Sequence, residues 1–347
     1  MGICGSNKIE RIPSKKELKY IKVANNDFSF IFTILQALYN LSSFKKFIVN
    51  YNSEQNKNKL SLYLKYIFKN DVNNDLIYNS KLIHYIIIKR FYYIEDNPGK
   101  LIFQILELLR QEHKNKKLPI DIKNNQNINN NEIIAFNNFI SEYSKENFNN
   151  QIAELFHFFI QKRIMFNNNI INYSYNFKCI FEFNLLDIFN SGKCSLNMQT
   201  QLPMINLFEC ISATLSPKFT NFNNMQCMEQ EFLYSTSSYL IFIMNRRGEN
   251  NNYYCGHFLY NDTINLSQFI VRDDNKNEYI LTSIIKERMN LIKNNSDNEE
   301  NTNYNYITIN RDENGQFYYY ESNLKKNGMF LNNEYFEHVL IYKQLAL

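Results

Sequence analysis

Cysteine and histidine are the side chains best suited to chemistry near neutral pH, and this chain places one of each close together, at Cys255 and His257. Residues two apart point to the same face of a strand, so the pair has the spacing of a thiol nucleophile with an imidazole base. The flanking segment is rich in tyrosine and shows no device that would stabilise an oxyanion. We therefore expect both side chains to serve ordinary packing.

A second concentration of ionisable residues lies at Glu107, Glu112 and His113. The apolar residues around them recur at helical spacing, so the three fall on a helix. We expect them to form the solvated face of that helix and do not expect a metal site there.

The first six residues, MGICGS, fit the pattern for N-myristoylation, in which the methionine is removed and Gly2 is acylated. Cys4 is a candidate for palmitoylation. This second signal matters because a single myristoyl chain gives only marginal membrane binding. Basic residues follow at Lys8, Arg11, Lys15, Lys16, Lys19 and Lys22. Residues 1–16 are thus predicted to be an acylated, basic membrane anchor, the alternative being a frayed terminus with a chance Gly-Cys pair.

The composition of the 347 residues excludes several kinds of partner and compartment. The net charge of +4 is spread along the chain without a dense basic stripe, so we expect no nucleic acid. Apolar runs such as 239–244 are far shorter than the roughly 20 residues that span a bilayer. The chain begins without a secretory signal, so its six cysteines are expected to be free thiols. The predicted location is the cytoplasmic face of a membrane, otherwise the cytoplasm.

The pattern of apolar residues changes along the chain from helical spacing to strand-like runs. Helical spacing predicts helices over 30–39, 82–91 and 98–113. Asparagine-rich segments predict loops at 124–131 and 294–303. Strands are predicted over 179–186, 238–244, 278–285, 304–310, 316–321 and 337–343. Helices followed by an antiparallel-looking sheet indicate the α+β class.

Residues 26–38, NDFSFIFTILQAL, resemble the cysteine box of ubiquitin-specific proteases, G-N-T-C-Y-M-N-S-x-L-Q-x-L. Residues 101–112 are similar to the family's helix E-F-L-x-x-L-L-D-x-L-H-E-E. Later segments follow in the family's order: 239–246 for P-x-x-L-I-I-x-L-x-R, 264–270 for L-D-L-S-x-F, 306–309 for H-Y-T-A, 315–322 for G-x-W-Y-x-F-D-D and 336–343 for A-Y-x-L-x-Y.

The resemblance covers residues 17–345 and implies the papain-like fold of this family. That fold has a helical thumb, expected at about 17–155, β-rich fingers at about 156–237 and an antiparallel β palm at about 238–345. The family binds the body of ubiquitin on the fingers and threads its tail between thumb and palm.

The same resemblance implies that the catalytic residues of the family are replaced here. Ser29 stands at the position of the cysteine nucleophile, and Tyr306 stands at that of the histidine base. The orienting acid falls on Glu321 or Ser322, and the oxyanion asparagine falls on Ala24, or on Asn25 after a shift of one. A serine hydroxyl needs a base to attack a carbonyl, and a phenol stays protonated near neutral pH. We therefore expect no catalytic residues, with Ser29 a helix cap or a polar core contact.

Family members often bind zinc in the fingers through two C-x-x-C pairs. Here Cys179 is followed at that spacing by Glu182, and Cys227 by Gln230. Two lone cysteines do not form a tetrahedral site, so we predict no metal and no cofactor.

These observations predict a catalytically dead pseudoenzyme that acts as a membrane-tethered module for binding ubiquitin or a ubiquitinated protein, or for scaffolding. One alternative is an active deubiquitinase of the same fold, a thiol or serine hydrolase using other residues. Another is a purely structural interaction protein that does not bind ubiquitin.

Overall fold

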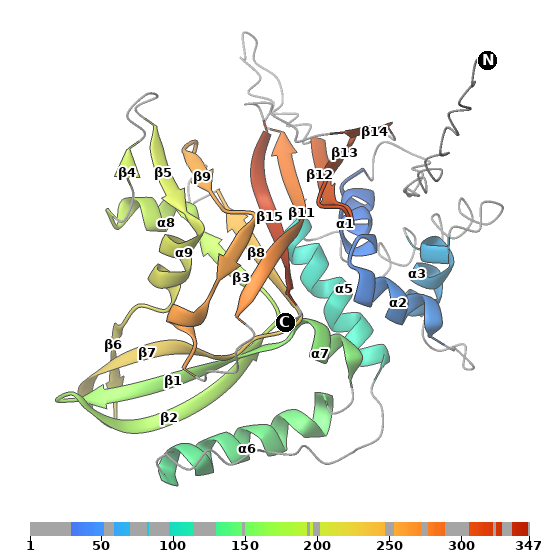
Figure 1. Cartoon of the computed structure of the whole chain (residues 1–347). Helices are drawn as coiled ribbons and strands as arrows, with labels where there is room; N and C mark the ends of the chain where they lie inside the picture. The colour runs from blue at the N-terminus through green and yellow to red at the C-terminus, as the bar shows by residue number, and fades with distance from the viewer. Residues whose placement is uncertain are drawn as a thin grey trace, which may run out of the picture.

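The computed structural model describes residues 29–51, 59–69, 82, 97–113, 130–147, 150–192, 195–196, 202–246, 253–271, 277–288, 305–321, 324–327 and 335–345. Most helices of the N-terminal half gather on one side of a large sheet, shorter helices lie on its other side, and a second sheet extends away from it (Figure 1). This is the predicted α+β class. No helix in the described ranges has the length and apolar content needed to cross a bilayer.

The helical part, the thumb, consists of α1 (Ser29–Tyr39), α2 (Ser42–Asn50), α3 (Lys59–Lys69), α5 (Pro98–Glu112) and α7 (Gln151–Phe156). Helix α5 starts where the sequence predicts. The Asn97 side chain accepts a hydrogen bond from the amide of Lys100, and Pro98 occupies the first turn, where its missing N–H costs nothing.

The large sheet, the palm, has the strand order β14-β13-β12-β11-β15-β8-β3, with β10 paired to β11. Its strands are β3 (Phe181–Asn184), β8 (Tyr239–Asn245), β10 (Thr263–Asn265), β11 (Glu278–Arg288), β12 (Asn305–Arg311), β13 (Phe317–Glu321), β14 (Leu324–Asn327) and β15 (Tyr335–Gln344). All pairs are antiparallel except β3 with β8.

Strand β8 is a continuous apolar run because both of its faces are buried. Tyr239, Ile241 and Ile243 join a hydrophobic core with the thumb helices. Leu240, Phe242 and Met244 join a second core on the opposite face of the palm. The palm therefore separates two cores and contributes side chains to both.

The second sheet, the fingers, has the order β2-β1-β7-β6, with β1 (Phe158–Phe166), β2 (Asn169–Lys178), β6 (Lys218–Phe222) and β7 (Met225–Ser235). Two-residue turns join β1 to β2 at Asn167 and Asn168 and β6 to β7 at Asn223 and Asn224. All four asparagines have positive φ, which asparagine tolerates better than most residues and which two-residue hairpins require. Helix α6 (Asn130–Asn147) lies along β2.

A small sheet of β4 (Ser195–Leu196), β5 (Pro203–Asn206) and β9 (His257–Leu259) completes the fold. Around it lie α8 (Leu185–Asn190), α9 (Leu207–Thr214) and the 3-10 helix η4 (Ser267–Phe269). Asn206 and Glu209 form a capping box that starts α9, since each side chain bonds the backbone amide of the other.

Three sequence expectations need correction. The strand predicted over 179–186 spans only Phe181–Asn184, because α8 begins at Leu185. Of the loop predicted over 124–131, the last two residues belong to α6. His113 and Glu112 were predicted to lie on a solvated face of α5, and this is wrong. His113 is only 4% exposed, and the carboxylate of Glu112 accepts hydrogen bonds from the backbone amides of Leu60 and Ser61 at the start of α3. The predicted helix 82–91, apart from Leu82, and the loop 294–303 lie outside the described residues.

Candidate functional site at the junction of thumb and palm

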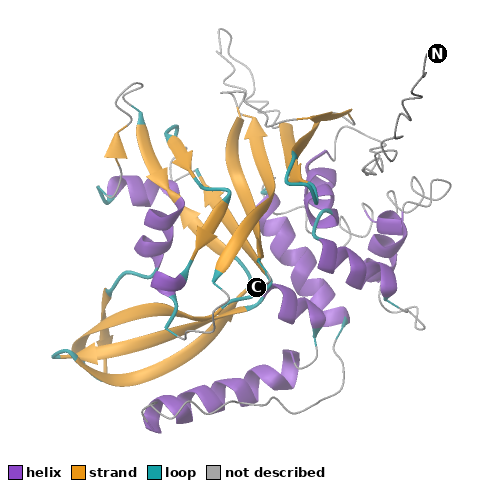
Figure 2. Cartoon of the chain, viewed as in Figure 1, coloured by secondary structure: helices purple, strands orange, loops and turns teal. Residues whose placement is uncertain are grey.

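The thumb meets the palm where α1 lies against β12 (Figure 2). The Thr308 hydroxyl donates to the carbonyl of Thr33 at 2.8 Å. One turn further along, the Asn310 amide donates to the carbonyl of Gln36 at 3.2 Å. Along this contact, α1 and β12 therefore run in the same direction. Ser29 begins the first turn of α1, and this turn lies toward the start of β12, which contains Tyr306. The Ser29 side chain is outside the described part of the chain.

Tyr306 is buried on the thumb side of the palm and belongs to the thumb core. Its cross-strand partner on β11 is Glu287, which is also buried. Its ring centroid lies 6.4 Å from that of His338 on β15, at an edge-to-face angle of 73°. A phenol, a carboxylate and an imidazole therefore meet across three neighbouring strands.

A β-bulge gives His338 this position. Ile285 pairs with Val339, but Lys286 pairs with Glu337, so His338 is an extra residue on β15. Its Nδ1 lies 3.2 Å from the Glu287 carboxylate, and its Nε2 lies 3.1 Å from the side-chain oxygen of Asn97, the cap of α5. The bulge thereby connects the palm to the first turn of α5.

Charged residues continue from this cluster along the ends of β8 and β15. Glu337 lies 3.0 Å from Lys286 and 3.4 Å from Arg246. The Arg246 guanidinium also donates to the carbonyls of Tyr254 and Gly256. Burial lowers the pKa of Arg246, and the Glu337 carboxylate opposes that shift. The described junction thus holds two carboxylates against two basic side chains and one histidine.

No cysteine contacts His338 in the described part of the chain. Cys179, Cys210 and Cys227 are buried elsewhere, and burial raises the pKa of Cys179 to about 12 and also raises the pKa of Cys210. A thiol with a raised pKa is a poor nucleophile. Within the described residues, His338 therefore holds an acid and an amide, and has no thiol to activate.

The remaining predicted positions are spread over the chain. Glu321 ends β13, and its side chain is among those not described. Gly2, Cys4, Ala24, Asn25 and Ser322 lie outside the described residues. Cys255 precedes β9, is exposed and lies 3.8 Å from the carbonyl oxygen of Tyr253, while His257 begins β9.

The two cysteines tested for zinc lie at opposite ends of the fingers. Cys179 follows β2 at the base of the sheet, whereas Cys227 lies near the tip, where its β6 partner is Thr220. Along β1, Cys179 lies one residue beyond the level of Phe158 and Cys227 one residue beyond that of Met165, so about nine residues of strand, or roughly 30 Å, separate them. They cannot share one metal ion, and the described residues contain no group of three or more metal-binding side chains close enough to hold one.

A serine-histidine contact in the thumb resembles a catalytic dyad but has the wrong proton arrangement. The Ser61 hydroxyl lies 2.6 Å from the Glu112 carboxylate and 2.7 Å from Nε2 of His113. A carboxylate can only accept, so the single hydroxyl proton goes to Glu112 and the imidazole must donate to Ser61. A base would have to accept that proton, so this contact fastens α3 to α5 and does not activate a nucleophile.

Sequence reasoning missed His338, Glu287 and Asn97. The apolar run in 337–343 identified β15 but not its extra residue, which only the strand register reveals. Glu287 lay just beyond the predicted strand 278–285. A usable signal was the cap Asn97 directly before Pro98, which marks the start of α5.

Solved structures with this architecture include those of the SAGA DUB module. No protein-family model and no curated protein matches the sequence. A module of Ubp8, Sgf11, Sus1 and Sgf73 matches with a TM-score of 0.65 and 11% identity over 95% of this chain and 68% of the other. A yeast SAGA DUB module matches at 0.64 and 11% over 95% and 69%, and a Ubp8 module bound to monoubiquitin at 0.64 and 11% over 95% and 70%. The chain thus has the fold of the ubiquitin-specific protease domain of Ubp8, with thumb, fingers and palm.

Proposed function

We propose that this protein is a catalytically inactive module that binds ubiquitin or a ubiquitinated protein at a membrane surface. The observation that carries the proposal is Tyr306. It stands where the family resemblance puts the histidine base, and its phenol is buried beside Glu287 and His338. A phenol that keeps its proton at neutral pH cannot deprotonate a nucleophile.

Ubiquitin binding is supported by the parts of the fold that remain. The thumb, palm and fingers are all present, and a structural neighbour with the same arrangement holds monoubiquitin. A chain that keeps the thumb, palm and fingers but lacks the base is expected to bind ubiquitin without cleaving it. Membrane attachment is supported by the acylation pattern at Gly2 and Cys4.

Two measurements on the full chain test binding and catalysis separately. Titration calorimetry with ubiquitin is expected to show binding, and ubiquitin without its C-terminal tail is expected to bind more weakly. If no heat of binding is detected up to millimolar ubiquitin, the protein does not bind ubiquitin, and the alternative of a structural interaction protein is favoured.

A ubiquitin probe with a C-terminal electrophile tests the catalytic half. We expect no covalent adduct. An adduct that is lost in Ser29→Ala or Cys255→Ala would instead identify an active hydrolase and the residue that attacks.

A further inference from the structure

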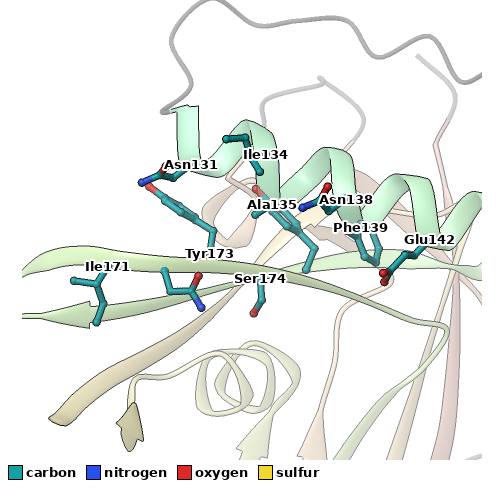
Figure 3. Close-up of a pocket in the computed structure, with 11 residues that line it drawn as sticks. Asn131, Ile134, Ala135, Asn138, Phe139, Glu142, Ile171, Tyr173 and Ser174 are labelled. Carbon is teal, nitrogen blue, oxygen red and sulfur yellow. The ribbon is translucent and has the colours of Figure 1, made fainter. Parts of the chain in front are cut away.

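A groove runs between α6 and β2 at the outer edge of the fingers (Figure 3). Its helix wall consists of Asn131, Ile134, Ala135, Asn138, Phe139 and Glu142. Its strand wall consists of residues 171–175 of β2, and the hollow has a volume of about 490 Å³. We name this feature the finger groove.

The helix wall is held firmly on the sheet. Phe136 packs against Tyr175 and Tyr234, with ring centroids 5.1 and 4.8 Å away. Phe139 and Tyr143 pack edge-on against Phe159 at 5.2 and 5.0 Å. Rings from one side of α6 therefore cover the face of the fingers and leave an adjoining side of the helix to line the groove.

The groove is bounded by the outer edge of β2 and not by a face of the fingers sheet. Alternate residues of a strand point to opposite faces, so a hollow on one face would be lined by every second residue. Here all five consecutive residues 171–175 line it. Strand β2 is also the last strand of its sheet and pairs only with β1 among the described strands. The backbone groups on its outer side thus lack a strand partner within the described residues.

The two walls match in length. Residues 131 to 142 extend about 16 Å along a helix, and residues 171 to 175 extend about 13 Å along a strand. A helix beside an unpaired strand edge leaves room for one more extended segment, whose N–H and C=O groups would meet those of β2. The strand wall accommodates about five residues of such a segment.

The side chains of the groove indicate what that segment contains. Ile134 is 58% exposed and Ile171 is 41% exposed, so one apolar wall residue on each side lacks cover. Glu142 is the one charged residue among those that line the groove. No salt bridge in the described part of the chain involves it, so its carboxylate is available to a cation.

We propose that the finger groove binds an extended peptide that adds to the edge of β2 as a further strand. An apolar side chain of the peptide covers Ile134 and Ile171, and a lysine or arginine lies beside Glu142. This site is separate from the thumb-palm junction, which contributes no residue to it.

A displayed library of random seven-residue peptides, selected on the immobilised full chain, tests the site. Enriched peptides are synthesised, and their affinity is measured by fluorescence anisotropy. Ala135→Trp fills the groove, and Asn137→Trp is its matched control, because Asn137 is exposed on the same helix but outside the groove. Circular dichroism checks that both variants fold.

We expect enriched peptides to alternate apolar and polar residues and to contain a lysine or arginine. Ala135→Trp should weaken their binding about tenfold or more, Glu142→Lys several-fold, and Asn137→Trp not at all. The backbone N–H groups of the odd-numbered and even-numbered peptide residues point to opposite edges of a strand. Methylating the nitrogens of one of these two sets should abolish binding and methylating the other should not, since only one edge of the added strand meets β2.

Three outcomes would overturn the proposal. One is no enrichment over the Ala135→Trp protein, and another is equal binding to both tryptophan variants. The third is self-association of the free protein that Ala135→Trp abolishes in sedimentation, because the occupant would then be a second copy of the chain.

Discussion

Single residues determine what the thumb-palm junction can do, and His338 is the clearest case. One inserted residue in β15 turns this imidazole toward Glu287 and Asn97. The arrangement resembles the acid-histidine part of a hydrolase, but Nε2 faces an amide oxygen. The acid-histidine pair therefore holds three elements together, namely β11, β15 and the start of α5.

Replacing Glu287 by glutamine tests this structural role. The substitution leaves Nδ1 of a buried histidine with a weaker partner, so the free energy of unfolding should fall by about 1–3 kcal/mol. The matched control is Glu278→Gln, an exposed position on the same strand, which should change it by less than about 0.5 kcal/mol. Urea unfolding measures both, and equal effects would contradict the assigned role.

Two buried histidines of the thumb should make the protein sensitive to acid. Burial lowers the pKa of His113 and of His157 to about 4, from about 6.5 when unfolded. Between pH 4 and pH 6.5 the unfolded chain binds protons that the folded chain does not. The contribution of the two neutral histidines to the free energy of unfolding is therefore fully present above pH 6.5 and is lost as the pH falls toward 4. Each histidine accounts for at most about 3 kcal/mol.

The double variant His113→Gln/His157→Gln should flatten that part of the pH profile. Urea unfolding at several pH values between 4 and 8 compares it with the unmodified protein. A loss of stability over this range that is the same in both proteins would show that other groups cause it.

Restoring the nucleophile alone should not restore catalysis. Ser29→Cys supplies a thiol, but Tyr306 still cannot accept its proton, and a missing general base costs about 10²-fold or more in rate. We expect no adduct with the electrophilic ubiquitin probe on the time scale of an active deubiquitinase. Rapid labelling that is lost in Ser29→Cys/His338→Gln would show that His338 acts as a replacement base.

At the scale of elements, the approach of α5 to β8 depends on Gly99. A methyl group at this position would overlap the side chain of Ile243. Gly99→Ala should therefore cost about 1–3 kcal/mol through overpacking, although alanine favours a helix. In the Ile243→Ala background the cost should disappear or reverse, and a double-mutant cycle from urea unfolding measures this coupling. Additive effects would mean that α5 does not press on β8.

The sequence predicts elements well where burial imposes a pattern. Helices α1 and α5 and strands β8, β11, β12, β13 and β15 lie where their spacing indicates, because each buries a stripe, a face or both faces. Strands β1 and β2 were not predicted individually. In β2, Ile171, Tyr173, Tyr175 and Phe177 alternate with Asn172, Ser174, Asn176 and Lys178, a strand signal that sequence reasoning did not use. Pairing at long range, which sequence spacing does not encode, forms this sheet.

At the scale of the whole molecule, the predicted anchor should decide where the protein resides. Co-expression with an N-myristoyltransferase should give a chain that floats with anionic vesicles, and Gly2→Ala should abolish flotation. Without a palmitoyl chain on Cys4, binding should be weak and should fall at high salt, because the basic residues then supply the second signal. Equal flotation of Gly2→Ala would contradict acylation at Gly2.

The central place of β15 has a consequence for synthesis on the ribosome. This strand lies between β11 and β8, yet it is made after every other described strand. Translation at about 5–20 residues per second leaves the thumb helices and β8 waiting many seconds for it. During that interval the apolar run of β8 lacks its neighbour. The nascent chain should therefore need chaperones to protect this apolar surface until β15 leaves the ribosome.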